Sequence, residues 1–112
     1  MPLQEHEVWI ADIGAVTAHR WQTTADREWL SGAPDLVVEV LSSSNTAQEM
    51  NDGEQICFQR GCQEFWIVDP KLNTVRISTL DGKWRIYEAN GDILLTRFGG
   101  KALRVADIFA AA

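Results

Sequence analysis

Apolar and polar positions alternate in short runs along most of the chain, and these runs predict strands. Residues 8–16, VWIADIGAV, form an apolar run that Asp12 and Gly14 interrupt. Residues 35–41, DLVVEVL, and residues 64–70, EFWIVDP, are two further runs rich in Val, Ile and aromatic residues. Such runs are typical of strands, and a strand that is apolar on both faces lies centrally in a covered sheet.

The segment between the last two runs has a helical period instead. Ser44 and Asn45 are candidates for the N-cap, and Gln48 follows Asn45 by three residues, as in a capping box. A stripe at helical spacing then comprises Ala47, Met50, Glu54, Cys57, Phe58 and Gly61. We expect a helix over residues 46–60, ended by the glycine of that stripe. Gly53 falls in its middle, where glycine costs about 1 kcal/mol relative to alanine.

The C-terminal part of the sequence predicts a hairpin and a short helix. The runs TVRISTL at 74–80 and KWRIYEA at 83–89 flank Asp81-Gly82, a dipeptide that tolerates the positive φ of a tight primed turn. Asn90-Gly91 marks another turn before the apolar run DILLT. The tail LRVADIFAAA indicates a short terminal helix.

These elements predict an α/β fold, more closely an α+β fold with a mixed sheet. A strand, a helix and a strand in succession imply a parallel crossover between the second and third strands. The hairpin then extends the sheet. The chain has 112 residues, so we expect one domain over 1–112 with one main crossover helix.

Strand geometry separates the two acids of the second strand. One face carries Leu36, Val38 and Val40, and the other carries Asp35, Val37 and Glu39. Asp35 and Glu39 lie roughly 13 Å apart along the backbone, too far to hold one ion. Asp35 is also a turn-cap candidate, and Glu39 can pair with an arginine or lie at a sheet edge. If the first two strands are neighbours, Asp12 can meet Glu39 and form a site for Mg²⁺ or Mn²⁺.

Composition and charge narrow the function classes. The net charge of −6 argues against a broad, sequence-independent grip on nucleic acid, although it leaves room for a small basic site. The five tryptophans indicate core and interface packing. Cys57 and Cys62 have no zinc or disulfide spacing, so we expect buried free thiols.

The sequence has no signal peptide, and no apolar run approaches the length of a membrane span. We therefore expect a cytoplasmic protein without a membrane partner.

The run GAPDLVVEVLSSSN, the following helix and the run GCQEFWIVDP resemble the Uma-type endonuclease family of the restriction-endonuclease-like PD-(D/E)XK superfamily. The resemblance extends through TVRISTLDG to LRVADIF. It implies a restriction-endonuclease-like core, DNA as the partner and a Mg²⁺- or Mn²⁺-dependent phosphodiesterase site. It places the site acids at Asp12 and Glu39, which would be the metal ligands, with Asp35 in support.

The sequence departs from the family pattern at three points. The superfamily lysine place holds Leu41, and the Uma-type lysine place, four residues before a tyrosine place held by Cys57, is Gly53. The usual N-terminal segment is also short here, which suggests a truncated member. These departures predict a weakened or inactive endonuclease. The alternative is a catalytically dead binding module that forms a homodimer, with Trp9, Trp21 and Trp29 as interface candidates.

Overall fold

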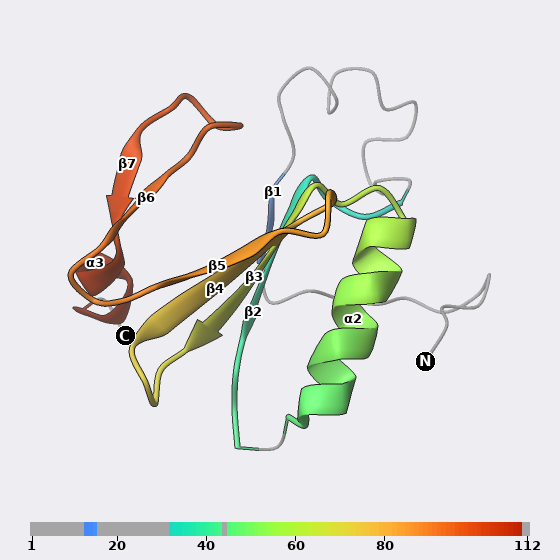
Figure 1. Ribbon diagram of the computed structural model, residues 1–112, viewed down its shortest axis with the longest axis horizontal. Coiled ribbons are helices and arrows are strands. Elements are labelled where there is room, and N and C mark those ends of the chain that lie inside the picture. Colours follow the sequence, from blue (N-terminus) through green and yellow to red (C-terminus); the bar gives the residue numbers. More distant parts are fainter. Residues whose placement is uncertain (1–12, 16–31, 44, 111–112) are drawn as a thin grey trace.

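A computed structural model describes residues 13–15, 32–43 and 45–110, and its main feature is a five-stranded mixed sheet with the order β1-β2-β3-β4-β5 (Figure 1). The strands of this sheet are β1 (Ile13–Ala15), β2 (Leu36–Val40), β3 (Glu64–Asp69), β4 (Thr74–Thr79) and β5 (Trp84–Tyr87). A second, two-stranded sheet pairs β6 (Asp92–Leu94) with β7 (Ala102–Arg104). The helices are α2 (Ala47–Gln59) and α3 (Val105–Ala110).

The strand pairing confirms the predicted crossover. Strand β2 runs parallel to β3, and α2 connects them, whereas β1, β4 and β5 all pair antiparallel with their neighbours. The first two predicted strands are neighbours, as the proposed meeting of Asp12 and Glu39 requires, although Asp12 itself lies outside the described residues. Neither helix in the described part of the chain is long and apolar enough to cross a membrane.

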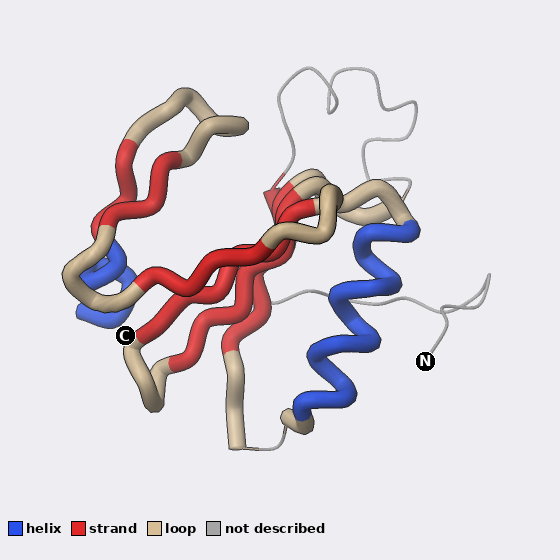
Figure 2. The backbone as a smooth tube through the Cα atoms, viewed as in Figure 1, coloured by secondary structure: helices blue, strands red, loops and turns tan. Residues whose placement is uncertain are grey.

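The main sheet is covered on both faces, by α2 on one and by the β6, β7 and α3 unit on the other (Figures 1 and 2). The core on the side of the C-terminal unit consists of Leu36, Val38, Trp66, Val68, Val75, Ile77, Ile93 and Val105. The core beneath α2 consists of Ala33, Val37, Cys57, Cys62 and Phe65. The two faces of β2 therefore divide as the alternation predicts, and Glu39 belongs to the α2 face.

Helix α2 begins one residue later than the expected cap. Thr46 is the N-cap: its hydroxyl accepts a hydrogen bond from the backbone N–H of Glu49 at 3.1 Å and donates one to the Glu49 carboxylate at 3.1 Å. The cap of the helix is thus formed by Thr46 with Glu49, not by Asn45 with Gln48. Asn45 closes the preceding turn instead, where its side-chain oxygen accepts from the Ser42 N–H and hydroxyl.

The β4–β5 hairpin forms as predicted, but its turn is wider than a two-residue primed turn. Of the turn residues only Gly82 has a positive φ, of 86°, and the backbone N–H of Thr79 donates to the carbonyl of Lys83. A primed type I turn needs two such residues. The pairing of β6 with β7 was not predicted, whereas the terminal helix was, and it is α3.

Candidate functional site

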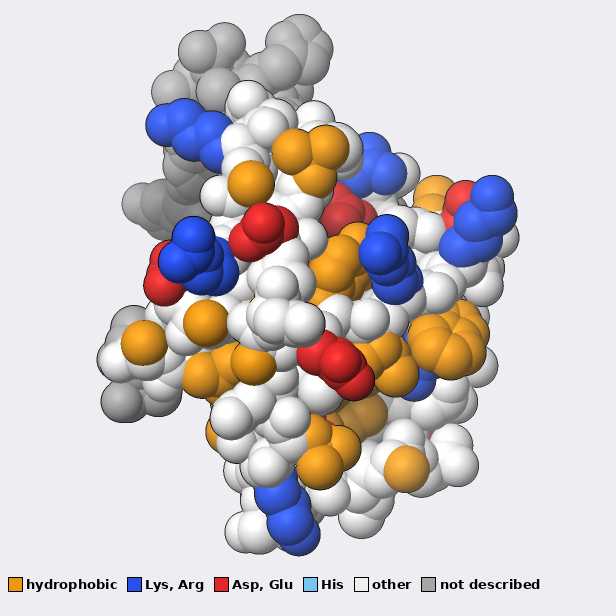
Figure 3. Space-filling model, turned by 60° about the vertical axis from the view of Figure 1, so that its left-hand side comes forward, with side chains coloured by type: hydrophobic (Ala, Val, Ile, Leu, Met, Phe, Trp, Pro, Cys, Tyr) orange, Lys and Arg blue, Asp and Glu red, His pale blue; other side chains and the backbone are white. Residues whose placement is uncertain are grey.

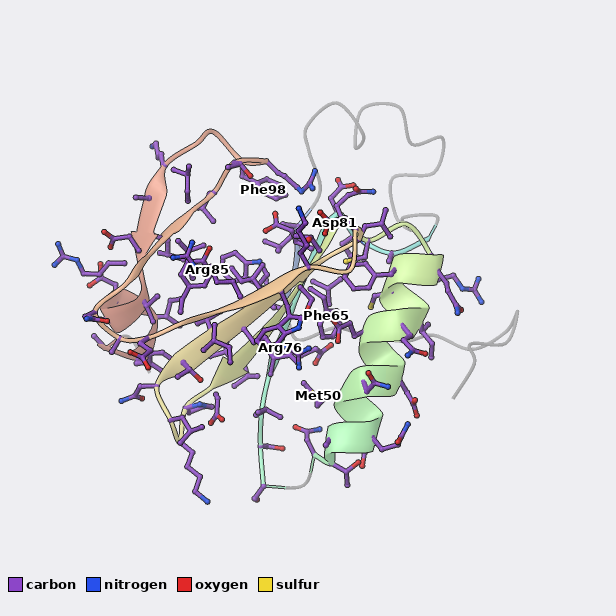
Figure 4. The ribbon with its side chains drawn as sticks, viewed as in Figure 1. Met50, Phe65, Arg76, Asp81, Arg85 and Phe98 are labelled. Atoms are coloured by element: carbon purple, nitrogen blue, oxygen red, sulfur yellow. The ribbon has the colours of Figure 1, made fainter. Side chains whose placement is uncertain are left out.

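Glu39 lines a small hollow between β2 and α2. The described residues around this hollow are Glu39, Asn45, Glu49, Met50, Gly53 and Phe65, and its volume is about 140 Å³. Glu39 comes from the sheet, and Glu49 and Gly53 come from one side of the helix, because they are four residues apart. Met50 and Phe65 also line this hollow, and both are labelled in Figure 4 between the helix and the sheet. Two carboxylates thus border one partly enclosed space.

Gly53 leaves the helix wall of this hollow open. A Cβ built on Gly53 would meet no atom within 4 Å, and the residue has ordinary helical backbone geometry. Packing therefore does not require a glycine at this position, so close approach does not explain it. A longer side chain here would extend beside Glu39 and Glu49.

Two buried thiols lie in the core beneath α2, next to the hollow of Glu39. Cys57, one turn after Gly53, is fully buried, and Cys62 packs in the same core. Burial is the main cause that raises the pKa of the Cys57 thiol to about 12, and the charges of Cys62, Glu39 and Glu54 raise it further. Both cysteines are free, as expected, and such thiols are unreactive at neutral pH.

Asp35 does not share the hollow of Glu39. It directly precedes β2, at the end of the strand opposite to Glu39, and its carbonyl oxygen accepts hydrogen bonds from the backbone N–H groups of Gln63 and Glu64. Its backbone therefore joins the start of β2 to the start of β3. Asp12, the remaining predicted site acid, directly precedes the described strand β1 in sequence.

The described donor set around the hollow consists of hard oxygen ligands, which fit Mg²⁺ or Mn²⁺. Mg²⁺ keeps several waters and takes one or two carboxylates from a protein, and Glu39 and Glu49 are two such groups. Within residues 13–15, 32–43 and 45–110, no cluster of three or more His, Cys, Asp or Glu side chains is placed to hold a metal. A third acid would have to come from outside this part of the chain.

Glu49 is the site neighbour that sequence reasoning missed. Its only sequence signal was its place three residues after Thr46, the residue whose hydroxyl it contacts at the helix cap. The side chain of Glu49 borders the hollow of Glu39 because of how α2 is rotated about its axis relative to the sheet. This rotation is set by tertiary packing.

The sequence matches the family model Uma2, described as "Putative restriction endonuclease", over residues 4–103. Among solved structures, the chain is similar to a putative nuclease belonging to DUF820 from Anabaena variabilis, with a TM-score of 0.63 and 24% sequence identity. The match covers 70% of this chain and 45% of that chain, so this chain spans less than half the length of that protein. At this identity the likeness shows a common fold. No curated protein matches the sequence.

The family match extends over most of the chain and confirms the resemblance that the runs GAPDLVVEVLSSSN and GCQEFWIVDP indicated. The structural likeness to a nuclease confirms the expected mixed α and β fold. The chain therefore belongs to the Uma2 family, whose members are described as putative restriction endonucleases.

Proposed function

We propose that this chain carries a metal-dependent endonuclease site for DNA and that turnover at this site is weak. Glu39 and Asp12 are the proposed metal ligands, and Asp35 is a supporting acid at the far end of β2. The observation that carries the proposal is that Glu39 and Gly53 border the same hollow. The resemblance to the family puts a metal-binding acid and a lysine at these two positions.

The strand register supports a role for Asp12. Ile13 lies opposite Val38 in the antiparallel pair of β1 and β2. One further step of the same ladder would set Asp12 opposite Glu39, on the face that α2 covers. Two carboxylates on neighbouring strands, with Glu49 across the hollow, would supply the oxygen ligands of a hydrated Mg²⁺ ion.

A Mg²⁺ ion bound at these carboxylates would polarise a phosphodiester and lower the pKa of an attacking water. Glu39 would hold and orient this centre from β2, a strand that is paired on both sides. A lysine at position 53 would position the water and stabilise developing negative charge, and Gly53 can do neither. None of the described residues around the hollow is a cation that could replace it. For this reason we expect slow turnover.

A cleavage assay on supercoiled plasmid tests the proposal. The wild type should nick DNA slowly in Mg²⁺ or Mn²⁺ and stop when EDTA is added, and Glu39→Gln should abolish the remaining rate. Glu54→Gln is the matched control, because Glu54 is also a half-buried acid on the α2 side but borders other hollows. Equal rates for the wild type and Glu39→Gln would exclude Glu39 from the chemistry.

A homodimeric binding module is the second candidate, and one observation favours it. Ile13 is 56% exposed and Val40 is 40% exposed, on the same face of two neighbouring strands at the β1 edge of the sheet. A second copy that covered this edge would bury both side chains. Sedimentation velocity separates the candidates: a dimer that Ile13→Lys dissociates supports the module, and a monomer at all concentrations removes it.

A further inference from the structure

A second hollow lies between α2 and the strands β4 and β5, separate from the site of Glu39. Its volume is about 250 Å³, and its wall includes Asn51, Glu54, Arg76, Ser78, Lys83 and Trp84. Gly53 and Asn51 are two residues apart on the helix, so they lie about 160° apart around its axis. The two hollows therefore open on opposite sides of α2, and the proposed endonuclease site does not account for this one.

Arg76 is one of the three charged residues among the described residues that line this hollow. Its side chain is half-buried between the sheet and α2 (Figure 4), and its guanidinium carbon lies 5.0 Å from the ring centroid of Trp84. Its Nε atom is buried and has no hydrogen-bond partner among the described residues. A partly desolvated guanidinium whose Nε atom has no hydrogen-bond partner favours a further acceptor nearby, because a buried donor without a hydrogen bond is costly.

Ser78 lines the buried part of this hollow. The residue is 5% exposed, and its hydroxyl has no hydrogen-bond partner within the described part of the chain. It lies directly across from Trp84 in the β4–β5 ladder, so its side chain and the indole share one face of the sheet. Buried polar groups are nearly always hydrogen-bonded, so a water molecule or a ligand oxygen beside these two atoms, the Ser78 hydroxyl and the Arg76 Nε, would complete their bonding.

Trp84 and Glu54 restrict what that ligand can be. Trp84 is 60% exposed, which leaves part of its indole available for stacking although Arg76 lies over the ring. Lys83 adds a cation at the rim of the hollow, whereas the carboxylate of Glu54 on the helix disfavours a bare anion. A ligand that combines an anionic group with a flat ring bearing an amino group matches all of these features, because the amino group can face Glu54.

We propose that this hollow binds a nucleotide, with the base stacked on Trp84 and the phosphate held by the guanidinium group of Arg76 and the ammonium group of Lys83. The same chemistry is offered by a free mononucleotide and by an unpaired nucleotide of a single DNA strand. On the face that Figure 3 draws, apolar, basic and acidic side chains are interspersed without a broad basic patch, which fits a local contact with a single nucleotide.

Calorimetric titration with dAMP, with a short oligo(dA) strand and with inorganic phosphate tests the site. The wild type should bind at least one of the two adenine ligands, and more tightly than inorganic phosphate. Trp84→Leu and Arg76→Met should each weaken that binding by about tenfold or more, within the range measured for stacking on an aromatic residue. Binding of dAMP points to a free nucleotide, and binding of oligo(dA) alone points to a DNA strand.

Two control variants keep the result independent of the endonuclease proposal. Arg85→Met removes a cation from the same hairpin, but Arg85 lies opposite Ile77 on the other face of the sheet and packs over Tyr87, so binding should not change. Glu39→Gln should also leave binding intact, even if it abolishes cleavage. Because Trp84 is largely exposed, Trp84→Leu should fold even if Arg76→Met does not.

Three results would overturn the nucleotide site. The first is no binding of either adenine ligand, and the second is phosphate binding as tightly as dAMP, which would indicate an adventitious anion contact. The third is a dimer that Arg76→Met dissociates, because the hollow would then hold an acidic side chain of a second copy.

Discussion

Glu39 on β2 and Gly53 on α2 border the same hollow, so the one acid in the middle of an apolar strand faces the one helix position without a side chain. The helix has room at this position, since a Cβ on Gly53 would meet nothing within 4 Å. Packing therefore does not require the glycine, and the proposed loss of a lysine at this position would be a chemical change and not a steric one.

Replacing Gly53 by lysine should raise both stability and cleavage. Removing a glycine from the interior of the helix should add about 1 kcal/mol to the free energy of unfolding. Glu49 precedes it by four residues, and this pair should add roughly 0.3 kcal/mol. If Glu39 binds the catalytic metal, the new ammonium group should raise the rate of plasmid cleavage about 100-fold or more, the usual size of such a contribution.

Gly53→Ala is the matched control for that variant, because it removes the glycine without adding a charge. It should gain nearly the same stability in urea unfolding and leave the cleavage rate at the wild-type level. If the wild type already cuts plasmid as fast as Gly53→Lys, the inference that Gly53 limits turnover is wrong.

Mn²⁺ binding should depend on Glu39 first and on Glu49 second. Calorimetric titration of the wild type should show binding, Glu39→Ala should abolish it, and Glu49→Ala should weaken it about tenfold, by removing one oxygen ligand. Glu54→Ala should leave the affinity unchanged, since Glu54 borders other hollows on α2. No binding in the wild type would remove the metal site altogether.

Much of this arrangement was predictable from local sequence rules, and the remainder depends on tertiary contacts. The face of Glu39 followed from the two-residue period of a strand. The N-cap of α2 was predicted one residue too early, because Asn45 and Thr46 are both suitable N-cap residues. In the structure the side chain of Asn45 accepts a hydrogen bond from Ser42 instead. The β6–β7 pair was missed because β7 has three residues with a single partly buried side chain, Leu103, and therefore almost no periodicity.

The positions of Glu49 and of the hollow beside Trp84 could not be predicted from the sequence for a different reason. Both depend on the rotation of α2 relative to the sheet, which sets the side of the helix that Glu49 occupies and the side that Glu54 occupies. The helical period predicts which residues share a side, but it does not say which strand that side faces.

Gly14→Ala should destabilise β1, the edge strand that pairs with β2. A Cβ at Gly14 would lie 2.7 Å from Cγ of Pro34, whose ring cannot rotate away. Relief needs a backbone shift, so we expect a loss of about 1–3 kcal/mol in the free energy of unfolding. Adding Pro34→Ala to the same chain should recover part of that loss, and a double-mutant cycle in urea measures the coupling. Additive effects of the two changes would show that the contact is not responsible.

Alkaline pH should destabilise the protein through its two buried thiols. Burial raises the pKa of Cys62 to about 11 and that of Cys57 to about 12, against an ordinary value of 9.0. Above pH 9 the unfolded chain loses these protons while the folded chain keeps them, so stability falls as pH rises. The contribution is complete below pH 9.0 and is lost between that pH and about 11 to 12. In this range each thiol lowers the free energy of unfolding by up to about 1.4 kcal/mol per pH unit.

A double variant that lacks both thiols separates their contribution from that of other groups that titrate at alkaline pH. Cys57→Ala with Cys62→Ala should lower stability at neutral pH, because each change leaves a cavity in the core beneath α2. Its free energy of unfolding in urea should nevertheless fall less steeply above pH 9 than that of the wild type. A single replacement should give an intermediate slope, since only one thiol then titrates. Parallel pH profiles for the wild type and the double variant would mean that both thiols ionise in the folded protein as easily as in the unfolded chain.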